Sequence, residues 1–148
     1  MAEMPIEWGK IREYAAATAA DPALYMEDRR APIPPTFLST VVFWDTPGEA
    51  TRTPEVAGAL ASLGIEADFR QLLSAEQEYV FHGPLPRAGD VLLTSHRFDS
   101  VETKEGRRGG TMVFVRFAVE FRDEAGDLRA ECLYTSVYTT RAAVGAAT

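Results

Sequence analysis

Residues 111–122 read Thr-Met-Val-Phe-Val-Arg-Phe-Ala-Val-Glu-Phe-Arg, and this stretch decides the fold class. Every second residue from Thr111 to Phe121 is β-branched or aromatic, so an extended strand would carry one continuous apolar face. Residues 123–127 then form a loop in which Gly126 can adopt a positive φ. We therefore predict a β-hairpin between this strand and a last strand over about residues 128–141.

Two further strands precede this hairpin. From residue 70 the pattern again alternates, and one face of the predicted strand carries Leu73, Ala75, Gln77, Tyr79 and Phe81. Gly83-Pro84 ends that strand, residues 87–90 turn the chain into a strand over about residues 91–102, and residues 105–110 make the next turn. Four successive antiparallel strands that follow helices indicate an α+β domain and not a parallel α/β sheet.

The first half of the chain predicts helices. The spacing i, i+3, i+4, i+7 predicts an amphipathic helix over about residues 7–20, with Ile11, Tyr14, Ala15 and Thr18 on its apolar face. Asp21-Pro22 ends this helix, and the prolines within residues 32–35 indicate an extended loop. A second, short helix follows Pro54-Glu55 over residues 56–63 and ends at Gly64.

Residues 37–44 are apolar almost throughout, and their pattern leaves two interpretations open. Their β-branched and aromatic side chains favour a strand. However, an antiparallel sheet with one buried face needs a helix to cover it, and this segment is the natural candidate. A sheet wrapped around one buried helix is the hot-dog arrangement.

Composition restricts the class of protein. The 148 residues fit a single domain, residues 1–148, and 15 Lys+Arg against 22 Asp+Glu give a net charge of −7, which argues against a nucleic-acid partner. The first ten residues lack the basic and apolar regions of a signal peptide, and no apolar run reaches about 18 residues, so we expect a cytoplasmic protein without a membrane span. The single cysteine, Cys132, can form no internal disulfide, and we expect neither a metal nor a cofactor.

Four stretches together resemble the MaoC-like dehydratase family, specifically its N-terminal, FAS-type hot-dog domain. They are Glu-Trp-Gly-Lys-Ile-Arg-Glu-Tyr-Ala at 7–15, Pro-Pro-Thr-Phe at 34–37, Glu-Gln-Glu-Tyr at 76–79 with His-Gly-Pro-Leu at 82–85 and Ala-Gly-Asp at 88–90, and Lys-Glu-Gly-Arg-Arg-Gly-Gly-Thr-Met at 104–112. The resemblance covers nearly the whole chain. It implies a hot-dog fold with residues 37–44 in a long central helix, side-by-side pairing of two such folds, and a strand before the first helix, for which residues 1–6 are barely long enough.

The resemblance also implies what the chain lacks. Catalytic relatives reversibly add water to a trans-2-enoyl thioester with an Asp and a His from a loop of the form Gly-Asp-x-Asn-Pro-x-His after the first helix. Here Ala19 stands near the Asp position, and Leu24 or Tyr25 near the His position. The resemblance therefore implies a non-catalytic, substrate-shaping subunit of an (R)-specific enoyl-CoA hydratase or 3-hydroxyacyl thioester dehydratase. Its partners would be a catalytic MaoC-like chain, in a heterodimer or heterotetramer, and an acyl-CoA or acyl-carrier thioester.

Four groups of residues are candidates for substrate binding. At the start of the expected central helix, Pro35, Thr36 and Phe37 either present backbone N–H groups to a thioester carbonyl or form a rigid turn. By the two-residue period of a strand, either Glu76 or Gln77 points inward and needs polar partners, in a structural network or in support of the partner's dyad. His82 either ends a strand with hydrogen bonds to backbone or serves the interface between paired domains.

The turn at residues 104–110 forms the fourth group, with Arg107, Gly109 and Gly110 as the candidates. Its cations, Lys104 among them, either steer a ligand or are simply solvated, and the ligand would be the phosphates of coenzyme A or the acidic surface of a carrier protein. Two other functions remain open. One is a self-sufficient homodimeric acyl-CoA thioesterase in which Glu76 or Asp21 activates water, and the other is a non-enzymatic acyl-thioester binding module.

Overall fold

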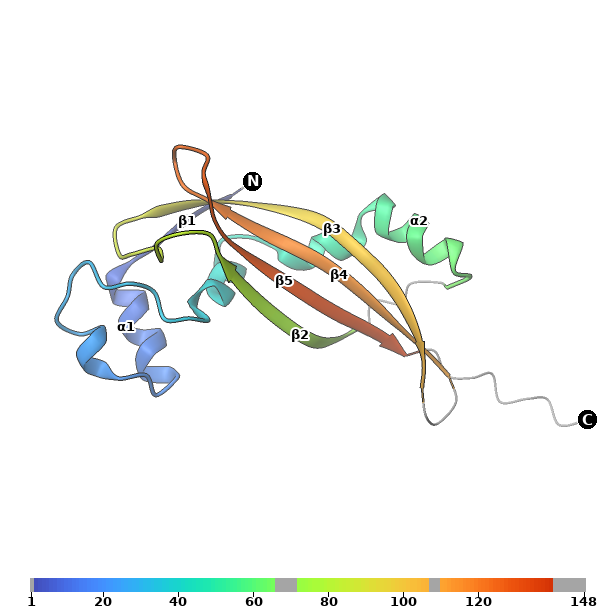
Figure 1. Cartoon of the computed structure of the whole chain (residues 1–148), viewed down its shortest axis with the longest axis horizontal. Coiled ribbons are helices and arrows are strands. Elements are labelled where there is room, and N and C mark those ends of the chain that lie inside the picture. Colours follow the sequence, from blue (N-terminus) through green and yellow to red (C-terminus); the bar gives the residue numbers. More distant parts are fainter. Residues whose placement is uncertain (1, 66–71, 107–109, 140–148) are drawn as a thin grey trace, which may run out of the picture. The chain divides into compact units, whose positions relative to one another are not determined.

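The computed structural model of the chain describes residues 2–65, 72–106 and 110–139. With η denoting a 3₁₀ helix, the elements in chain order are β1 (Ala2–Pro5), α1 (Trp8–Ala17), η1 (Pro22–Leu24), η2 (Phe37–Phe43), η3 (Pro47–Arg52), α2 (Pro54–Ser62), β2 (Leu72–Phe81), β3 (Val91–Glu105), β4 (Thr111–Arg122) and β5 (Leu128–Thr139). The strands form one sheet in the order β1-β3-β4-β5-β2, with β1 and β2 at its two edges (Figure 1). The predicted α+β class is confirmed.

Hairpins join β3 to β4 and β4 to β5. In the first, the Gly106 N–H donates to the Gly110 carbonyl at 2.9 Å, and in the second the Asp123 N–H donates to the Asp127 carbonyl at 3.0 Å. Gly126 has φ 89°, as the predicted second hairpin requires. The strand predicted over residues 91–102 continues three residues further, to Glu105.

The strand implied before the first helix is present and short. β1 pairs antiparallel with the start of β3, from Ala2 opposite Thr94 to Pro5 opposite Val91. Pro5 is tolerated because it ends an edge strand, where a missing N–H costs no bond within the sheet. The described part of the chain therefore forms a sheet of five strands, one more than the four that the alternating patterns predict.

The two α-helices end with the same pattern of backbone hydrogen bonds but with different residues. After α2, Gly64 has φ 70°, and the Ile65 N–H donates to the Leu60 carbonyl. After α1, Ala19 has φ 53°, and the Ala20 N–H donates to the Ala15 carbonyl. Both ends form a Schellman motif, which places one residue in the left-handed region. α1 thus ends at Ala17, three residues before the predicted end.

The expected long central helix is instead the seven-residue 3₁₀ helix η2. Phe37, Leu38 and Val41 on it are fully buried, whereas Val42 and Phe43 are 57% and 79% exposed. Because Pro47 disfavours the helical conformation at the residue before it, a continuous helix cannot extend far past Trp44. Residues 37–44 are therefore helical and pack one face inward, as the resemblance implied, but the helix is short.

Contacts divide the chain into two compact units. The first comprises residues up to Pro47 with Tyr79–His96 and Val119–Cys132. The second comprises Gly48–Glu78, Arg97–Ala118 and residues from Leu133 onward, and its buried cluster includes Val56, Leu60, Val113, Val115 and Tyr138. Among the described residues, no helix has both the length and the hydropathy needed to cross a bilayer.

Candidate functional site

A network of hydroxyl groups lies where η2 begins. The Tyr14 hydroxyl from α1 is 2.9 Å from the Thr36 carbonyl oxygen and 2.8 Å from the Thr36 hydroxyl. It therefore donates to the carbonyl and accepts from the hydroxyl, because it carries one proton. The Tyr14 ring packs edge-on against Phe37, with 5.5 Å between centroids. α1 and the start of η2 are thus fixed to each other by polar and aromatic contacts.

Tyr79 on β2 extends this network within the first unit. Its hydroxyl hydrogen-bonds to Ser39 on η2 and to Cys132 on β5. Burial, together with the Cys132 thiol, raises the pKa of Tyr79 far above its ordinary value of 10.0, so the phenol stays protonated. Cys132 is itself fully buried.

The turn at residues 35–37 uses its N–H groups internally. The Phe37 N–H donates to the Pro34 carbonyl at 2.9 Å, and the Ser39 N–H donates to the Thr36 carbonyl at 3.1 Å. Pro35 and Thr36 are exposed, whereas Phe37 is fully buried. These bonds fit the rigid-turn interpretation, and a role of this turn in thioester binding stays a prediction.

A cleft of about 570 Å³ opens beside the network, between α1 and η2. An ion pair of 3.0 Å between Lys10 and Glu13 lies in its wall. The other lining residues are mainly apolar or aromatic: Tyr14, Ala17, Thr40, Phe43 and Trp44. The cleft can therefore accept an apolar group, but its lining contains no imidazole.

The loop after α1 has neither group of the dyad in the expected places. Ala19 offers no functional side chain, Leu24 is 59% exposed and Tyr25 is buried. Asp21 is a carboxylate of this loop, and its Oδ1 accepts the Ala23 N–H at 3.0 Å, which fixes a local turn. The carboxylate of this loop therefore stabilises a turn of the chain.

His82 follows β2 and pairs with a carboxylate. Its Nε2 lies 2.8 Å from Oε2 of Glu131 on β5, and its backbone N–H donates to the Arg129 carbonyl at 2.9 Å. The main chain of His82 therefore bonds to the backbone, as one of the two interpretations expected, and its side chain bonds to a carboxylate. An interface role for His82 stays a prediction.

A second histidine–carboxylate contact was not predicted from the sequence. Nε2 of His96 on β3 lies 3.0 Å from Oδ2 of Asp45, which follows η2, and Oδ2 also accepts the Thr94 hydroxyl. The Asp45–His96 approach lacks hydrogen-bond geometry, so it is an ion pair when the imidazole is protonated. Burial opposes the charge on Asp45, but the hydrogen bonds from Thr94 and the Thr46 N–H, with the His96 charge, lower its pKa overall.

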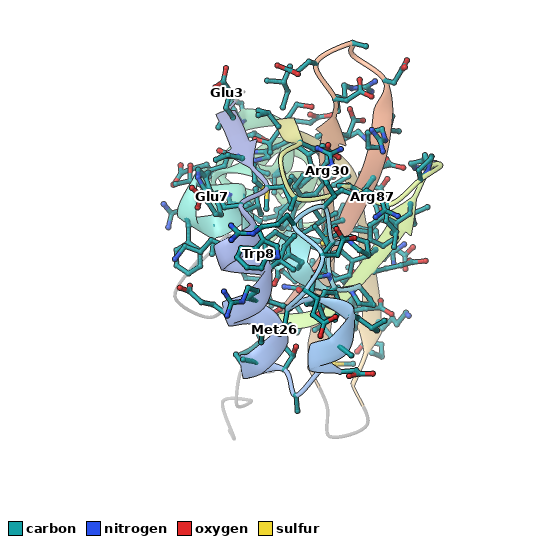
Figure 2. All side chains as sticks on the ribbon, turned by 90° about the vertical axis from the view of Figure 1, so that its left-hand side faces the viewer. Glu3, Glu7, Trp8, Met26, Arg30 and Arg87 are labelled. Carbon is teal, nitrogen blue, oxygen red and sulfur yellow. The ribbon has the colours of Figure 1, made fainter. Side chains whose placement is uncertain are left out.

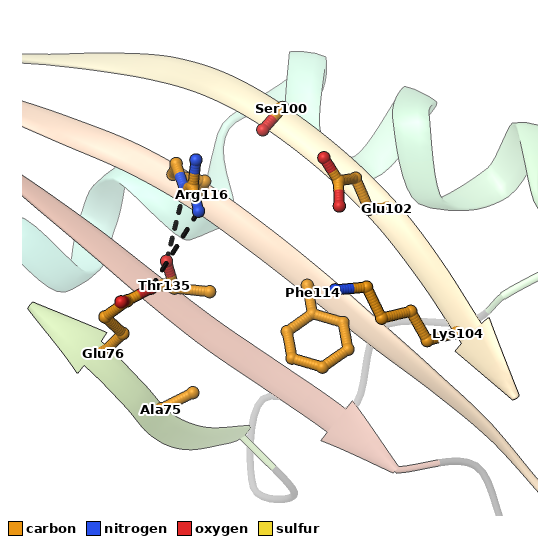
Figure 3. Close-up of a pocket in the computed structure, with 8 residues that line it drawn as sticks. All are labelled: Ala75, Glu76, Ser100, Glu102, Lys104, Phe114, Arg116 and Thr135. Atoms are coloured by element: carbon orange, nitrogen blue, oxygen red, sulfur yellow. Dashed lines mark hydrogen bonds and ion pairs between the residues drawn. The ribbon is translucent and has the colours of Figure 1, made fainter. Parts of the chain in front are cut away.

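Glu76 and Gln77 are both exposed, so the prediction that one of them is buried was wrong. β2 is an edge strand, and residues 73–78 are exposed along both of its faces. Glu76 lies 4.0 Å from Nη2 of Arg116 on β4, whose Nε donates to Thr135 on β5 at 3.3 Å. These side chains line an open depression of about 320 Å³ on the sheet face of the second unit (Figure 3).

The candidates of the charged turn are only partly described. Arg107 and Gly109 lie outside the described residues. Gly110 accepts the hydrogen bond that closes the turn, and the ammonium group of Lys104 lies 5.1 Å from the centroid of the Phe114 ring. The predicted contacts with phosphates or with a carrier protein stay predictions.

A tryptophan between two guanidinium groups marks another corner of the first unit. The guanidinium carbons of Arg12 and Arg29 lie 4.5 and 4.2 Å from the Trp8 ring centroid. Nearby, Nη1 of Arg87 donates to the Arg30 carbonyl at 3.0 Å (Figure 2). Acidic Asp90 lies 3.5 Å from Arg30, so the corner carries charges of both signs.

The sequence of residues 2–131 matches the family described as "FAS1-like, dehydratase domain region". The chain belongs to this family. No curated protein matches it in sequence. The resemblance to FAS-type dehydratase domains that the motifs indicated is thereby confirmed for this FAS1-like dehydratase domain.

Solved structures share its fold. The C-terminally truncated HadBC (3R-hydroxyacyl-ACP dehydratase) complex from Mycobacterium tuberculosis matches with a TM-score of 0.55 and 20% identity, over 91% of this chain and 89% of that chain. The ChsH1-ChsH2 complex from the same organism matches with a TM-score of 0.64 and 15% identity, over 95% and 86%. A MaoC-like dehydratase matches with a TM-score of 0.64 and 21% identity, over 94% of this chain and 40% of its own. The FAS1-like dehydratase domain therefore has the predicted hot-dog fold.

Proposed function

We propose that this chain is a non-catalytic, substrate-shaping subunit of an (R)-specific enoyl-CoA hydratase or 3-hydroxyacyl thioester dehydratase. It would act in the cytoplasm, paired with a MaoC-like chain that supplies an Asp and a His. The reaction needs a group that activates or eliminates water and one that handles the α-proton. The proposal assigns both of these groups to the partner.

The loop after α1 carries the proposal. Ala19 has no functional side chain, and Asp21 is engaged with the backbone of its own turn. General acid–base groups contribute roughly 10²–10⁴-fold each to a rate. A chain without them at the reacting centre would be nearly inactive alone.

The two histidines of the chain do not replace the missing one. His82 contacts Glu131, and His96 contacts Asp45. Neither lines the cleft between α1 and η2. That cleft remains the best candidate in the first unit for contact with an acyl group, because aromatic and aliphatic side chains form most of its wall.

The free edge of β2 supports pairing with a second chain. An edge strand leaves backbone N–H and C=O groups unpaired, and a strand of another chain can bond to them. β2 is ten residues long, and its first half is covered on neither face by the described chain. Two of the structures that share the fold are described as complexes, which agrees with such pairing.

The test is an assay for hydration of crotonyl-CoA and of a longer enoyl-CoA, in which the reaction is monitored as a loss of the enoyl absorbance. We expect no turnover from the purified chain, turnover from its complex with a catalytic MaoC-like chain, and none when the partner's dyad histidine is replaced by Gln. As a matched control, Asp21→Asn in this chain should leave the rate of the complex unchanged within about twofold, because Asp21 only fixes a turn. Hydration by the isolated chain at an ordinary enzymatic rate would refute the proposal.

The same preparation separates the two alternative functions. Release of free thiol from acyl-CoA by the isolated chain, lost in Glu76→Gln or Asp21→Asn, would identify the thioesterase. Binding of acyl-CoA without turnover, and without a complex with any MaoC-like chain, would identify the binding module.

A further inference from the structure

The edge strand β2 is acidic where it is most open to a partner. Its sequence, Leu-Leu-Ser-Ala-Glu-Gln-Glu-Tyr-Val-Phe, contains two carboxylates and no Lys or Arg. Glu76 and Glu78 are exposed and lie on the same face, because side chains two residues apart share a face of a strand. Both residues therefore belong to β2, which forms a free edge of the sheet (Figure 1).

The two carboxylates differ in whether a cationic side chain of the described chain lies near them. Glu76 has a partner in Arg116, although the 4.0 Å distance and the exposure of both side chains make the pair weak (Figure 3). Glu78 has no cationic partner among the described residues. A strand that pairs with β2 thus meets at least one negative charge that no described residue compensates.

Self-pairing of β2 about any of its residues from Ala75 to Tyr79 brings these charges together. In an antiparallel pair related by a two-fold axis, the residues on either side of the axis lie opposite each other. An axis at Gln77 places Glu76 opposite Glu78 twice, and an axis at Glu76 or Glu78 places that carboxylate opposite its own copy. An axis at Ala75 or Tyr79 still leaves one carboxylate diagonal to its copy, at roughly 7–8 Å. Like charges in these positions destabilise the pair.

We infer that β2 selects a non-identical partner whose edge strand carries Lys or Arg opposite Glu76 and Glu78. This inference rests on the proposed pairing with a second chain and names the chemistry of that partner. Opposite charges directly across a strand pair stabilise it, and the same arrangement excludes the wrong partner. The net charge of −7 adds a general repulsion between copies and favours encounter with a basic surface.

A charge reversal within this chain tests the inference without the catalytic partner. In the double variant Glu76→Lys with Glu78→Lys, β2 is basic, so a mixture of the variant with the natural chain contains complementary edge strands. Native mass spectrometry and sedimentation should show a mixed dimer with a Kd about tenfold or more below that of either chain alone. The preference for the mixed dimer over either self-paired dimer should shrink in high salt, since the pairs between the introduced lysines and the natural glutamates would be exposed. Hydrogen exchange of the peptide over residues 72–81 should slow in the mixture.

The matched control is Glu27→Lys with Glu124→Lys, which changes the net charge equally at exposed carboxylates away from β2. Equal dimerisation of this control with the natural chain would overturn the inference, because overall charge would then be the cause. A natural chain that pairs with itself through β2 as tightly as the mixture, or a mixture without tighter pairing, would overturn it as well. No substrate or catalytic chain is present, so failure here is distinct from failure of the hydratase assay, which tests the proposed function.

Discussion

Asp45 Oδ2 lies 3.0 Å from His96 Nε2 and accepts the Thr94 hydroxyl, which joins the end of η2 to β3 in the first unit. The side chains of Asp45 and His96 are only 15% and 19% exposed, and Thr94 is fully buried. A partly buried carboxylate with two donors and a potential cation is stabilised as the charged form. The contact therefore contributes to stability while Asp45 is ionised.

Asp45→Asn should destabilise the chain by about 1–3 kcal/mol at neutral pH, because a charged hydrogen bond is lost. The pKa of Asp45 is lowered on folding, so its contribution is present above the ordinary value of 3.8 and is lost as the pH falls through the folded value. Urea denaturation should therefore show a difference between the natural chain and the variant that shrinks in acid below about that value. A difference that grows toward acid would contradict this sign.

Ala19→Gly should stabilise the chain by about 1 kcal/mol. Ala19 has φ 53°, a conformation that costs alanine but not glycine. Its counterpart Gly64 makes the converse control, since a Cβ there meets no atom within 4 Å and Gly64→Ala would add only backbone strain. Thermal denaturation should show a Tm higher by about 2–4 °C for the first variant and a lower Tm for the second. Equal or opposite shifts would refute the left-handed assignment.

Arg29→Gln should cost about 0.5–1 kcal/mol, because its guanidinium group lies over the Trp8 ring. Chemical denaturation of the single variants and of Arg29→Gln combined with Trp8→Leu measures the coupling between the two residues. The cost of Arg29→Gln should largely vanish once Trp8 is replaced. An unchanged cost would show that the arginine acts through other neighbours.

Tyr79→Phe should cost about 1 kcal/mol at neutral pH, since the hydroxyl bonds to Ser39 and Cys132 are lost. The raised pKa of Tyr79 means that its contribution is complete below the ordinary value of 10.0 and is lost as the pH rises beyond it. The stability advantage of the natural chain over Tyr79→Phe should therefore decline in alkali. An ultraviolet titration of the phenolate absorbance would check the assignment. Tyr79→Phe should remove only the part of that absorbance that appears above the ordinary tyrosine pKa of 10.0.

The local patterns of the sequence predict the sheet well. The stretch at residues 111–122 coincides with β4, and burial alternates along it from Val113 onward except at Ala118, which is buried on the opposite face. Residues 37–44 were ambiguous for a physical reason. Their β-branched side chains favour a strand, and burial of Phe37, Leu38 and Val41 on one face overrides that preference. The pattern left both interpretations open, and the family resemblance decided in favour of the helix.

The candidate site was harder to predict because its contacts join distant parts of the chain. Asp45 and His96 are far apart in sequence, and each alone carries no signal of the other. His96 could have been singled out only as one of two histidines. The prediction that either Glu76 or Gln77 points inward was wrong for a different reason. The two-residue period gives the faces of a strand but does not say whether the chain covers them, and nothing described covers the first half of β2.

The single cysteine of the chain, Cys132, is completely enclosed, and this makes the protein convenient for spectroscopic labelling. A maleimide reagent reacts with an accessible thiolate, so the native thiol should remain unmodified while the protein is folded. A cysteine introduced by Ser74→Cys would then be the sole attachment point for a fluorophore or spin label, and the dye would report directly on the approach of another polypeptide to β2.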